Sequence, residues 1–445
     1  MLTVSEDSCL AWFVCMGAFL TLAGTSGIDN SFGIVINVII THLNITTTRV
    51  SWIQSTHSTF MFLFAFVSSF LLKKYGLRII ILSGTIICCT SYIICAFFKN
   101  YPVLILLYGI AGGVGSGLLY TAGNIACFKY FKKFQTLASG IAMSGTGFGM
   151  IIVSLSCSFA VLNFGYTGYF ITLSIISSLS SLFALFVFPI RMDNQDSNVE
   201  EKSSPTISGS KKDERVSMKT CEKKKYGSVI DESVSMKKLE QMTNSQKDEV
   251  KKVLMLMKDK RLLCYCLVQV FFELAYYIPM DFLPDMMNDN GISKQQANTI
   301  ISIFGSSILV SKWTLALILR YFKTNPIVFS SISMTLLGVC CVLYPFCSTY
   351  KYYVLVTAVY GIVLSSVDML IPFIILNLFD AKRLDDGFGL VMLTKALIPL
   401  WGSPIAGALR DWTGNYNLAF YTASCFLFIG GLINIIVYLL QLKII

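Results

Sequence analysis

Apolar stretches of about 20 residues recur along the whole chain, and they constrain its fold more than any other feature. A helix needs about 20 mainly apolar residues to cross the hydrocarbon core of a bilayer. Of the 445 residues, 55% are hydrophobic and 13% are charged, whereas a soluble domain carries about 25% charged residues. The sequence therefore excludes an ordinary soluble protein and predicts an all-α membrane protein.

Twelve apolar stretches are long enough to span, six before a long polar segment and six after it. The first six predicted spans are Leu10–Ile34, Ser51–Leu72, Ile79–Phe98, Pro102–Cys127, Thr136–Val161 and Thr167–Pro189. The second six are Leu262–Leu283, Asn298–Leu319, Ile327–Phe346, Val354–Leu378, Gly387–Leu409 and Leu418–Leu440.

The polar segment between the two sets divides the chain into three predicted regions. It is rich in Ser and in charges of both signs and nearly free of aromatic residues, which is the composition of a disordered linker. We therefore expect an N-terminal six-helix bundle at 1–190, a cytoplasmic disordered linker at 191–260 and a C-terminal six-helix bundle at 261–445.

Basic residues predict the orientation of the chain, because Lys and Arg collect in cytoplasmic loops. They cluster in the second and fourth loops, the linker, and the eighth and tenth loops. In a twelve-span chain these loops share one side with both termini, so we expect cytoplasmic termini in a multi-pass protein of the plasma membrane. Asn44-Ile45-Thr46 is a glycosylation sequon on the predicted outer side, and it lies close to the membrane.

The stretch Tyr130–Gly149, YFKKFQTLASGIAMSGTGFG, contains a helix studded with small residues. Small residues let neighbouring helices approach closely in a bilayer. We therefore expect this helix to pack tightly, as a flexing contact between helices of the N-terminal bundle. Its marker residues are Tyr130, Phe131, Gly140, Gly145 and Gly149.

Tyr130–Gly149 resembles the fifth-span signature of the monocarboxylate transporter (solute carrier 16-like) family of the major facilitator superfamily. Further motifs agree in order and spacing over the whole length of the chain. They are Tyr75-Gly76-Leu77-Arg78, the glycines between Gly109 and Gly117, Tyr276-Tyr277-Ile278-Pro279, Phe282-Leu283-Pro284-Asp285, Phe388-Gly389, Gly402–Gly407, Asp411 and Gly414. The resemblance implies the major facilitator fold, with twelve transmembrane helices in two six-helix bundles.

The chain also departs from that family's pattern. The first-span signature is reduced to Glu6-Asp7-Ser8 and Ala11-Trp12. Phe134-Gln135 replace the usual arginines. In the eighth span the family's proton-coupled lactate carriers have an Asp and an Arg, where this chain has Ile308 and Lys312, and a first-span lysine of those carriers falls on Ser31. The resemblance therefore implies the fold but not proton-coupled lactate transport.

Five ionisable residues lie inside predicted spans, where each charge is costly and usually functional. They are Asp29, Glu273, Lys312, Asp368 and Lys395. In the superfamily fold the helices that carry them surround the central pathway, so we expect a binding site at mid-membrane.

We assign expected roles to these residues and to one neighbour. Lys312 would hold a substrate carboxylate as a point charge with three donors, with Asp29, Asp368 and Ser31 as further substrate-binding candidates. Asp29, Glu273, Asp368 and Lys395 are candidates for proton coupling or gating, since desolvation favours a neutral carboxyl.

Structural alternatives remain for the same residues. Lys395 with Asp368, or Lys312 with Glu273, would form ion pairs that lock one conformation, and Glu273 could instead lie near a membrane face. His57 in the second span either titrates near neutral pH or joins a helix–helix hydrogen bond.

The sequence favours an alternating-access transporter of a small organic anion or zwitterion, monocarboxylate-like or amino-acid-like, with proton coupling as an option. The alternative is a non-transporting membrane receptor or scaffold built on a transporter fold. No catalytic constellation, metal-ligand spacing or cofactor motif is present in the sequence, so we expect no enzyme, no metal and no cofactor. Expected partners are a small-molecule substrate, the lipid bilayer and an ancillary single-span membrane protein, with no nucleic acid.

Overall fold

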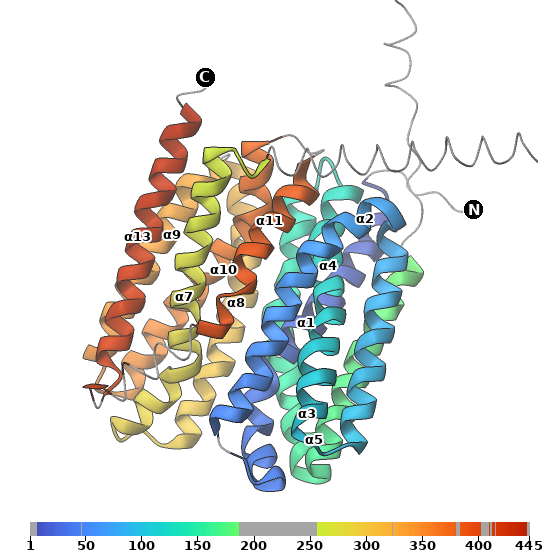
Figure 1. The fold of residues 1–445 in the computed structure, drawn as a ribbon. Coiled ribbons are helices and arrows are strands. Elements are labelled where there is room, and N and C mark those ends of the chain that lie inside the picture. Colours follow the sequence, from blue (N-terminus) through green and yellow to red (C-terminus); the bar gives the residue numbers. More distant parts are fainter. Residues whose placement is uncertain are drawn as a thin grey trace, which may run out of the picture. The chain divides into compact units, whose positions relative to one another are not determined.

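The structure, a computed structural model, describes residues 7–45, 47–186, 256–322, 324–379, 383–401, 409, 412–413 and 415–442. The helices before and after the long gap belong to one compact unit. Figure 1 shows the first half in blue to green and the second half in yellow to red. Most of the predicted linker 191–260, together with Gly402–Gly407, Asp411, Gly414 and Thr46 of the sequon, lies outside the described residues.

The first half consists of long helices that continue through two of the expected turns. The elements are α1 (Cys9–Leu43), α2 (Thr47–Phe97), α3 (Tyr101–Leu104), the π-helix η1 (Ile105–Gly112), α4 (Gly113–Tyr130) and α5 (Gln135–Phe186). α3, η1 and α4 follow one another without a break and together form the fourth predicted span.

Two glycines divide the longest helices. Gly76 in α2 has φ 78° and Gly165 in α5 has φ 61°, a left-handed conformation that glycine adopts without steric cost. Each glycine separates two predicted spans, so α2 contains the second and third spans and α5 the fifth and sixth.

The second half follows the predicted order of spans seven to twelve. Its elements are α7 (Lys260–Asp289), α8 (Lys294–Phe322), α9 (Pro326–Leu343), the 3-10 helix η2 (Tyr344–Phe346), α10 (Tyr350–Leu378), α11 (Leu384–Ala396) and α13 (Asn417–Leu442). α11 supplies the first part of the eleventh span.

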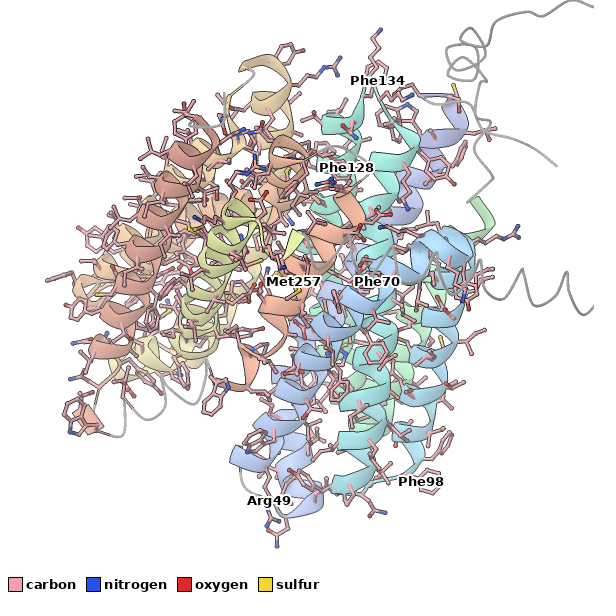
Figure 2. The ribbon with its side chains drawn as sticks, turned by 45° about the horizontal axis from the view of Figure 1, so that its top comes forward. Arg49, Phe70, Phe98, Phe128, Phe134 and Met257 are labelled. Atoms are coloured by element: carbon pink, nitrogen blue, oxygen red, sulfur yellow. The ribbon has the colours of Figure 1, made fainter. Side chains whose placement is uncertain are left out.

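Nine helical segments among the described residues are long and apolar enough to cross a membrane. Two of them contain two spans each, and α11 adds the start of one more, which agrees with twelve helices. Large apolar side chains such as Leu162 (85% exposed) and Phe159 (66% exposed) face outward, as lipid contact requires. Figure 2 places Arg49 and Phe98 at the end of the first half opposite to Phe134, as alternating spans demand.

The predicted small-residue helix α5 packs closely on two different faces. On one face, a Cβ at Gly145 or Gly149 would lie 2.2 Å from the carbonyl oxygen of Phe19 or 2.0 Å from that of Ala23, both on α1. Gly145 and Gly149 are four residues apart, the spacing that lets two membrane helices approach backbone to backbone.

The other face of α5 contacts the second half of the molecule. A Cβ at Gly140 would lie 2.3 Å from Cβ of Ala316, and one at Gly147 would lie 2.6 Å from the backbone nitrogen of Leu309, both on α8. The sequence predicted close packing within the N-terminal bundle; the structure adds a second close contact between the halves.

Ion pairs also join the two halves, at the end where α4 finishes and α11 begins. Lys73 of α2 pairs with Asp386 of α11. Lys129 of α4 lies 3.2 Å from Asp385, also of α11. Both lysines belong to the loops that predict the cytoplasmic side.

Asp7 ties the start of α1 to the turn before α5. Its carboxylate accepts hydrogen bonds from the backbone N–H groups of Lys133 (3.0 Å), Phe134 (3.2 Å) and Lys132 (3.4 Å). Burial raises the pKa of the Asp7 carboxyl, but these bonds and the Lys133 charge outweigh it, so the pKa lies below its ordinary value of 3.8. The reduced first-span signature thus supplies a structural anchor.

Candidate functional site

A cavity lies between the two halves, with walls from both of them; the empty space in it and at its open mouth is about 820 Å³. All five ionisable residues predicted inside the membrane line it. The first half contributes Asp29 from α1, and the second contributes Glu273, Lys312, Asp368 and Lys395 from α7, α8, α10 and α11. Other polar lining residues are Ser26, Asn30, Tyr120, Asn124, Thr146, Tyr276, Tyr277 and Ser365.

Lys395 is shared between two carboxylates. Its Nζ lies 2.5 Å from Oε1 of Glu273 and 3.2 Å from Oδ1 of Asp368. The side chains of Lys395 and Glu273 are 2% and 4% exposed, while that of Asp368 is 32% exposed. The ammonium also lies 5.5 Å from the ring centre of Phe62. Glu273 is therefore buried at the cavity wall, and Asp368 keeps an open side.

Lys312 has a different environment from Lys395. It is 5% exposed, and its Nζ donates a hydrogen bond of 2.7 Å to Oγ1 of Thr146, a residue of α5 in the other half. Within the described parts of the chain it forms no ion pair, so the suggested Lys312–Glu273 pair is wrong for this conformation. An ammonium keeps three donors, so Lys312 can still bind an anionic group from the cavity.

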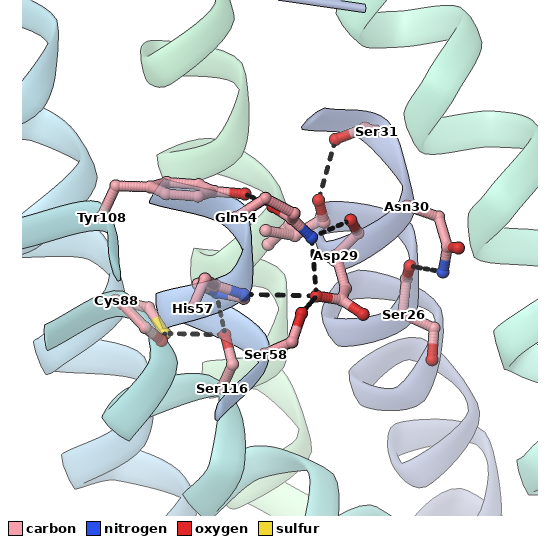
Figure 3. Close-up of polar contacts among 12 residues, drawn as sticks. Ser26, Asp29, Asn30, Ser31, Gln54, His57, Ser58, Cys88, Tyr108 and Ser116 are labelled. Carbon is pink, nitrogen blue, oxygen red and sulfur yellow. Dashed lines mark hydrogen bonds and ion pairs between the residues drawn. The ribbon is translucent and has the colours of Figure 1, made fainter. Parts of the chain in front are cut away.

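Asp29 is held by three side chains of α2 that converge on one carboxylate oxygen (Figure 3). Its Oδ1 accepts hydrogen bonds from Ser58 Oγ (2.8 Å) and Gln54 Nε2 (3.0 Å) and lies 3.3 Å from Nδ1 of His57. Gln54 Nε2 also donates to the backbone carbonyl of Asp29 (2.7 Å). Asp29 therefore belongs to a pre-arranged polar cluster.

Ser31 does not lie among the cavity-lining residues. It is fully buried, its Oγ donates to the carbonyl of Ile28 (3.1 Å), and it is hydrogen-bonded to the hydroxyl of Tyr169 (3.2 Å). Two residues along a helix turn the side chain by about 200°, so Ser31 and Asp29 project from different faces of α1. We therefore leave Ser31 out of the candidate binding site.

Sequence reasoning missed several polar residues that complete the site. Thr146, Gln54 and Ser58 each contact one of the predicted charges. Gln54, His57 and Ser58 occupy positions i, i+3 and i+4 in an apolar span and therefore share one helix face. That polar face can be read from the sequence, and a polar face in an apolar span indicates a buried polar or charged partner on another helix.

Two helical halves around a central cavity with buried charges of both signs are the architecture of a membrane transporter. The sequence model of the Major Facilitator Superfamily matches residues 14–280 and 265–443. The chain belongs to this superfamily.

Curated relatives agree with this assignment at low identity. The chain is 25% identical to "Monocarboxylate transporter 2" of Homo sapiens, over 96% of this chain and 87% of the relative. It is 25% identical to "Monocarboxylate transporter 12" of Xenopus laevis (93% and 85% covered) and 23% identical to "Monocarboxylate transporter 1" of Rattus norvegicus (96% and 84% covered). The family resemblance in the sequence motifs is thereby confirmed.

Proposed function

We propose that this protein carries a small organic anion or zwitterion across the membrane by alternating access. The observation that supports this most is the contrast between the two cavity lysines. Lys395 forms ion pairs with both Glu273 and Asp368, whereas Lys312 has no ion pair among the described residues and donates its hydrogen bond to the neutral hydroxyl of Thr146. A substrate carboxylate would supply the missing counter-charge to Lys312.

The remaining cavity charges favour a substrate that also carries a positive group. Three carboxylates face two lysines in the cavity, so one negative charge is in excess when all five are ionised. Asp368 is a third exposed and Asp29 is 21% exposed, so both can reach a ligand. An amino-acid-like zwitterion would place its carboxylate on Lys312 and its ammonium beside Asp368 or Asp29; a plain monocarboxylate would need an added proton to keep the same balance.

Rocking of the N-terminal bundle (1–190) against the C-terminal bundle (261–445) would expose this cavity alternately to each side. The pairs Lys73–Asp386 and Lys129–Asp385 would close the end that we assign to the cytoplasm, with both termini and the 191–260 tether on the same side. The proposal places the protein in the plasma membrane, with an ancillary single-span membrane protein as a candidate partner.

An uptake assay in reconstituted vesicles tests the proposal. Labelled monocarboxylates, amino acids and organic cations are compared in the unaltered protein, in Lys312→Met and in Lys312→Arg. A hydrogen bond to a charged group is worth about 1.5–3 kcal/mol, so Lys312→Met should lower uptake of the carboxylate-bearing substrate about 10- to 100-fold. Lys312→Arg keeps the charge and should lose less.

Lys351→Met is the matched control, because Lys351 is exposed and does not line the cavity. It removes the same charge and should leave uptake unchanged. Full activity of Lys312→Met would remove the basis of the proposal. Specific ligand binding with no flux of any tested compound would instead favour the receptor or scaffold alternative.

A further inference from the structure

His57 lies behind Asp29, buried outside the residues that line the cavity. The His57 side chain is 0% exposed, whereas that of Asp29 is 21% exposed and lines the cavity. The Nδ1 atom of His57 lies 3.3 Å from Oδ1 of Asp29 (Figure 3). The imidazole therefore communicates with the cavity through the carboxylate of Asp29.

The far side of the imidazole faces two hydroxyl groups. Its Nε2 lies 3.4 Å from the hydroxyl of Tyr92 and 3.4 Å from Oγ of Ser116. A hydroxyl can donate or accept by rotating its hydrogen. Nε2 therefore finds a partner both as an acceptor in the neutral ring and as a donor in the imidazolium, and neither state leaves a buried polar atom unpaired.

The ring is also fixed in orientation by aromatic packing. Tyr108 stacks on His57 with a centroid separation of 4.8 Å and an interplanar angle of 23°. The hydroxyl of Tyr108 donates to Oε1 of Gln54 (3.1 Å), and Nε2 of the same Gln54 side chain donates to Oδ1 of Asp29 (3.0 Å). Tyr108 belongs to the π-helix η1, and such departures from α-helical geometry occur frequently at functional sites.

The groups that face the couple set its charge balance. Among the described residues, the charged group in contact with the ring is Asp29 on α1. The ring also meets Tyr108 on η1, Tyr92 on α2 and Ser116 on α4. One bond further out, Cys88 on α2 is hydrogen-bonded to Ser116, and Tyr169 on α5 is hydrogen-bonded to Ser31. Across the cavity stand Glu273, Lys312, Asp368 and Lys395.

We propose that Asp29 and His57 together form a proton-binding site of the transporter. A proton from cavity water enters at Asp29 and is held on the imidazole, so that both ring nitrogens donate: Nδ1 to Asp29 and Nε2 to Tyr92 or Ser116. The charge of the couple rises from −1 to zero, which cancels the excess negative charge of the cavity. The site thus couples one proton to the entry of one anion, and in this respect it rests on the proposed function.

Histidine-labelled protein provides a test that needs no substrate. The chain contains two histidines, His42 and His57, so ¹³C-histidine NMR in lipid nanodiscs gives two signals, assigned with His42→Gln. We expect the His57 signal to change with pH and this change to differ in Asp29→Asn, while the His42 signal is the same in both proteins. A His57 signal that does not titrate, or that is unaffected by Asp29→Asn, would overturn the proposal.

Proton-driven accumulation of labelled pyruvate and labelled alanine provides the second test. With one proton per substrate, an inward gradient of one pH unit supports about tenfold accumulation. His57→Asn retains a donor near the position of Nδ1 but cannot bind a proton, so accumulation should fall to about onefold; His42→Gln, which leaves the proposed site intact, should accumulate normally. Undiminished proton-driven accumulation in His57→Asn refutes the site. Absence of uptake of both probes by every protein counts against the proposed function, and the NMR titration then still decides the proton site.

Discussion

Replacing Lys395 with methionine should show how much the ion pairs of Lys395 with Glu273 and Asp368 contribute to the stability of the fold. Methionine is similar in length and apolar, so the change removes the charge with little loss of volume. It leaves Glu273, whose side chain is 4% exposed, without a counter-charge, and Asp368, 32% exposed, without its lysine. An unpaired buried charge costs about 3–5 kcal/mol, whereas the more exposed Asp368 contributes less than about 1 kcal/mol.

Protonation sets an independent limit on that cost. A free glutamic acid has a pKa of about 4.3, and the free energy needed to protonate its carboxylate rises by about 1.4 kcal/mol for each pH unit above that value. Neutralising Glu273 in Lys395→Met would therefore cost about 4 kcal/mol at pH 7 and about 1 kcal/mol at pH 5. The cost of an unpaired buried charge and the cost of protonating Glu273 agree at pH 7. Only protonation predicts that most of the loss of stability disappears in mild acid.

Unfolding of purified protein in detergent measures this loss. Many cysteines of the described chain are free and buried, so a thiol-reactive dye reports unfolding during titration with a denaturing detergent at pH 7 and pH 5. The double variant Glu273→Gln/Lys395→Met removes both buried charges and should lose no more than about 1 kcal/mol at either pH. An equal loss at both pH values in Lys395→Met, or no loss at all, would refute the reasoning.

Three further outcomes follow from other contacts. Gly149→Ala should destabilise by about 1–3 kcal/mol, because its Cβ would lie 2.0 Å from a carbonyl oxygen of α1. Gly33→Ala, with nothing within 4 Å of the new Cβ, should be neutral or gain up to about 1 kcal/mol; similar thermal unfolding of the two variants would contradict the close packing. Asp386→Lys should open the end of the cavity closed by Lys73, seen as increased cysteine labelling from that side. The exchange Lys73→Asp/Asp386→Lys should restore closure, and failure to do so would argue against the pair. Asp7→Asn should lower thermal stability above about pH 4, and the gap should close as pH falls through the depressed pKa of Asp7; a gap independent of pH would exclude the carboxylate as its cause.

The elements of the fold could be predicted because each depends on local sequence. Span length and the breaks between spans depend on neighbouring residues, and the structure keeps them. Two of these breaks lie at Gly76 and Gly165, which the sequence analysis did not single out as turns. The apolar run of α1 continues to Leu43 rather than Ile34, since nothing in that stretch interrupts a helix before Asn44.

The candidate site was only half visible in the sequence. The five charges could be found from the sequence because a charge inside a membrane span is costly. Their partners could not, because these depend on which helix faces meet. Lys395 lies against two acids and Lys312 against Thr146 because α11 and α8 approach different helices. Ser31 could not be placed from the sequence for the same reason. It is two residues from Asp29, and on α1 its side chain meets Tyr169 rather than the cavity.

The two glycine faces of α5 have a kinetic consequence. Gly145 and Gly149 hold α5 against α1 in its own half, while Gly140 and Gly147 touch α8 of the other half. Interlocked side chains resist sliding because every knob must leave its hole and change rotamer. Gly140 and Gly147 place no side chain against α8, so at these two positions there is nothing to interlock; the side-chain links between α5 and α8 are hydrogen bonds, from Lys312 to Thr146 and from Trp313 to Ser144. The glycines at 140 and 147 would then govern how fast the two orientations exchange rather than which of them is favoured.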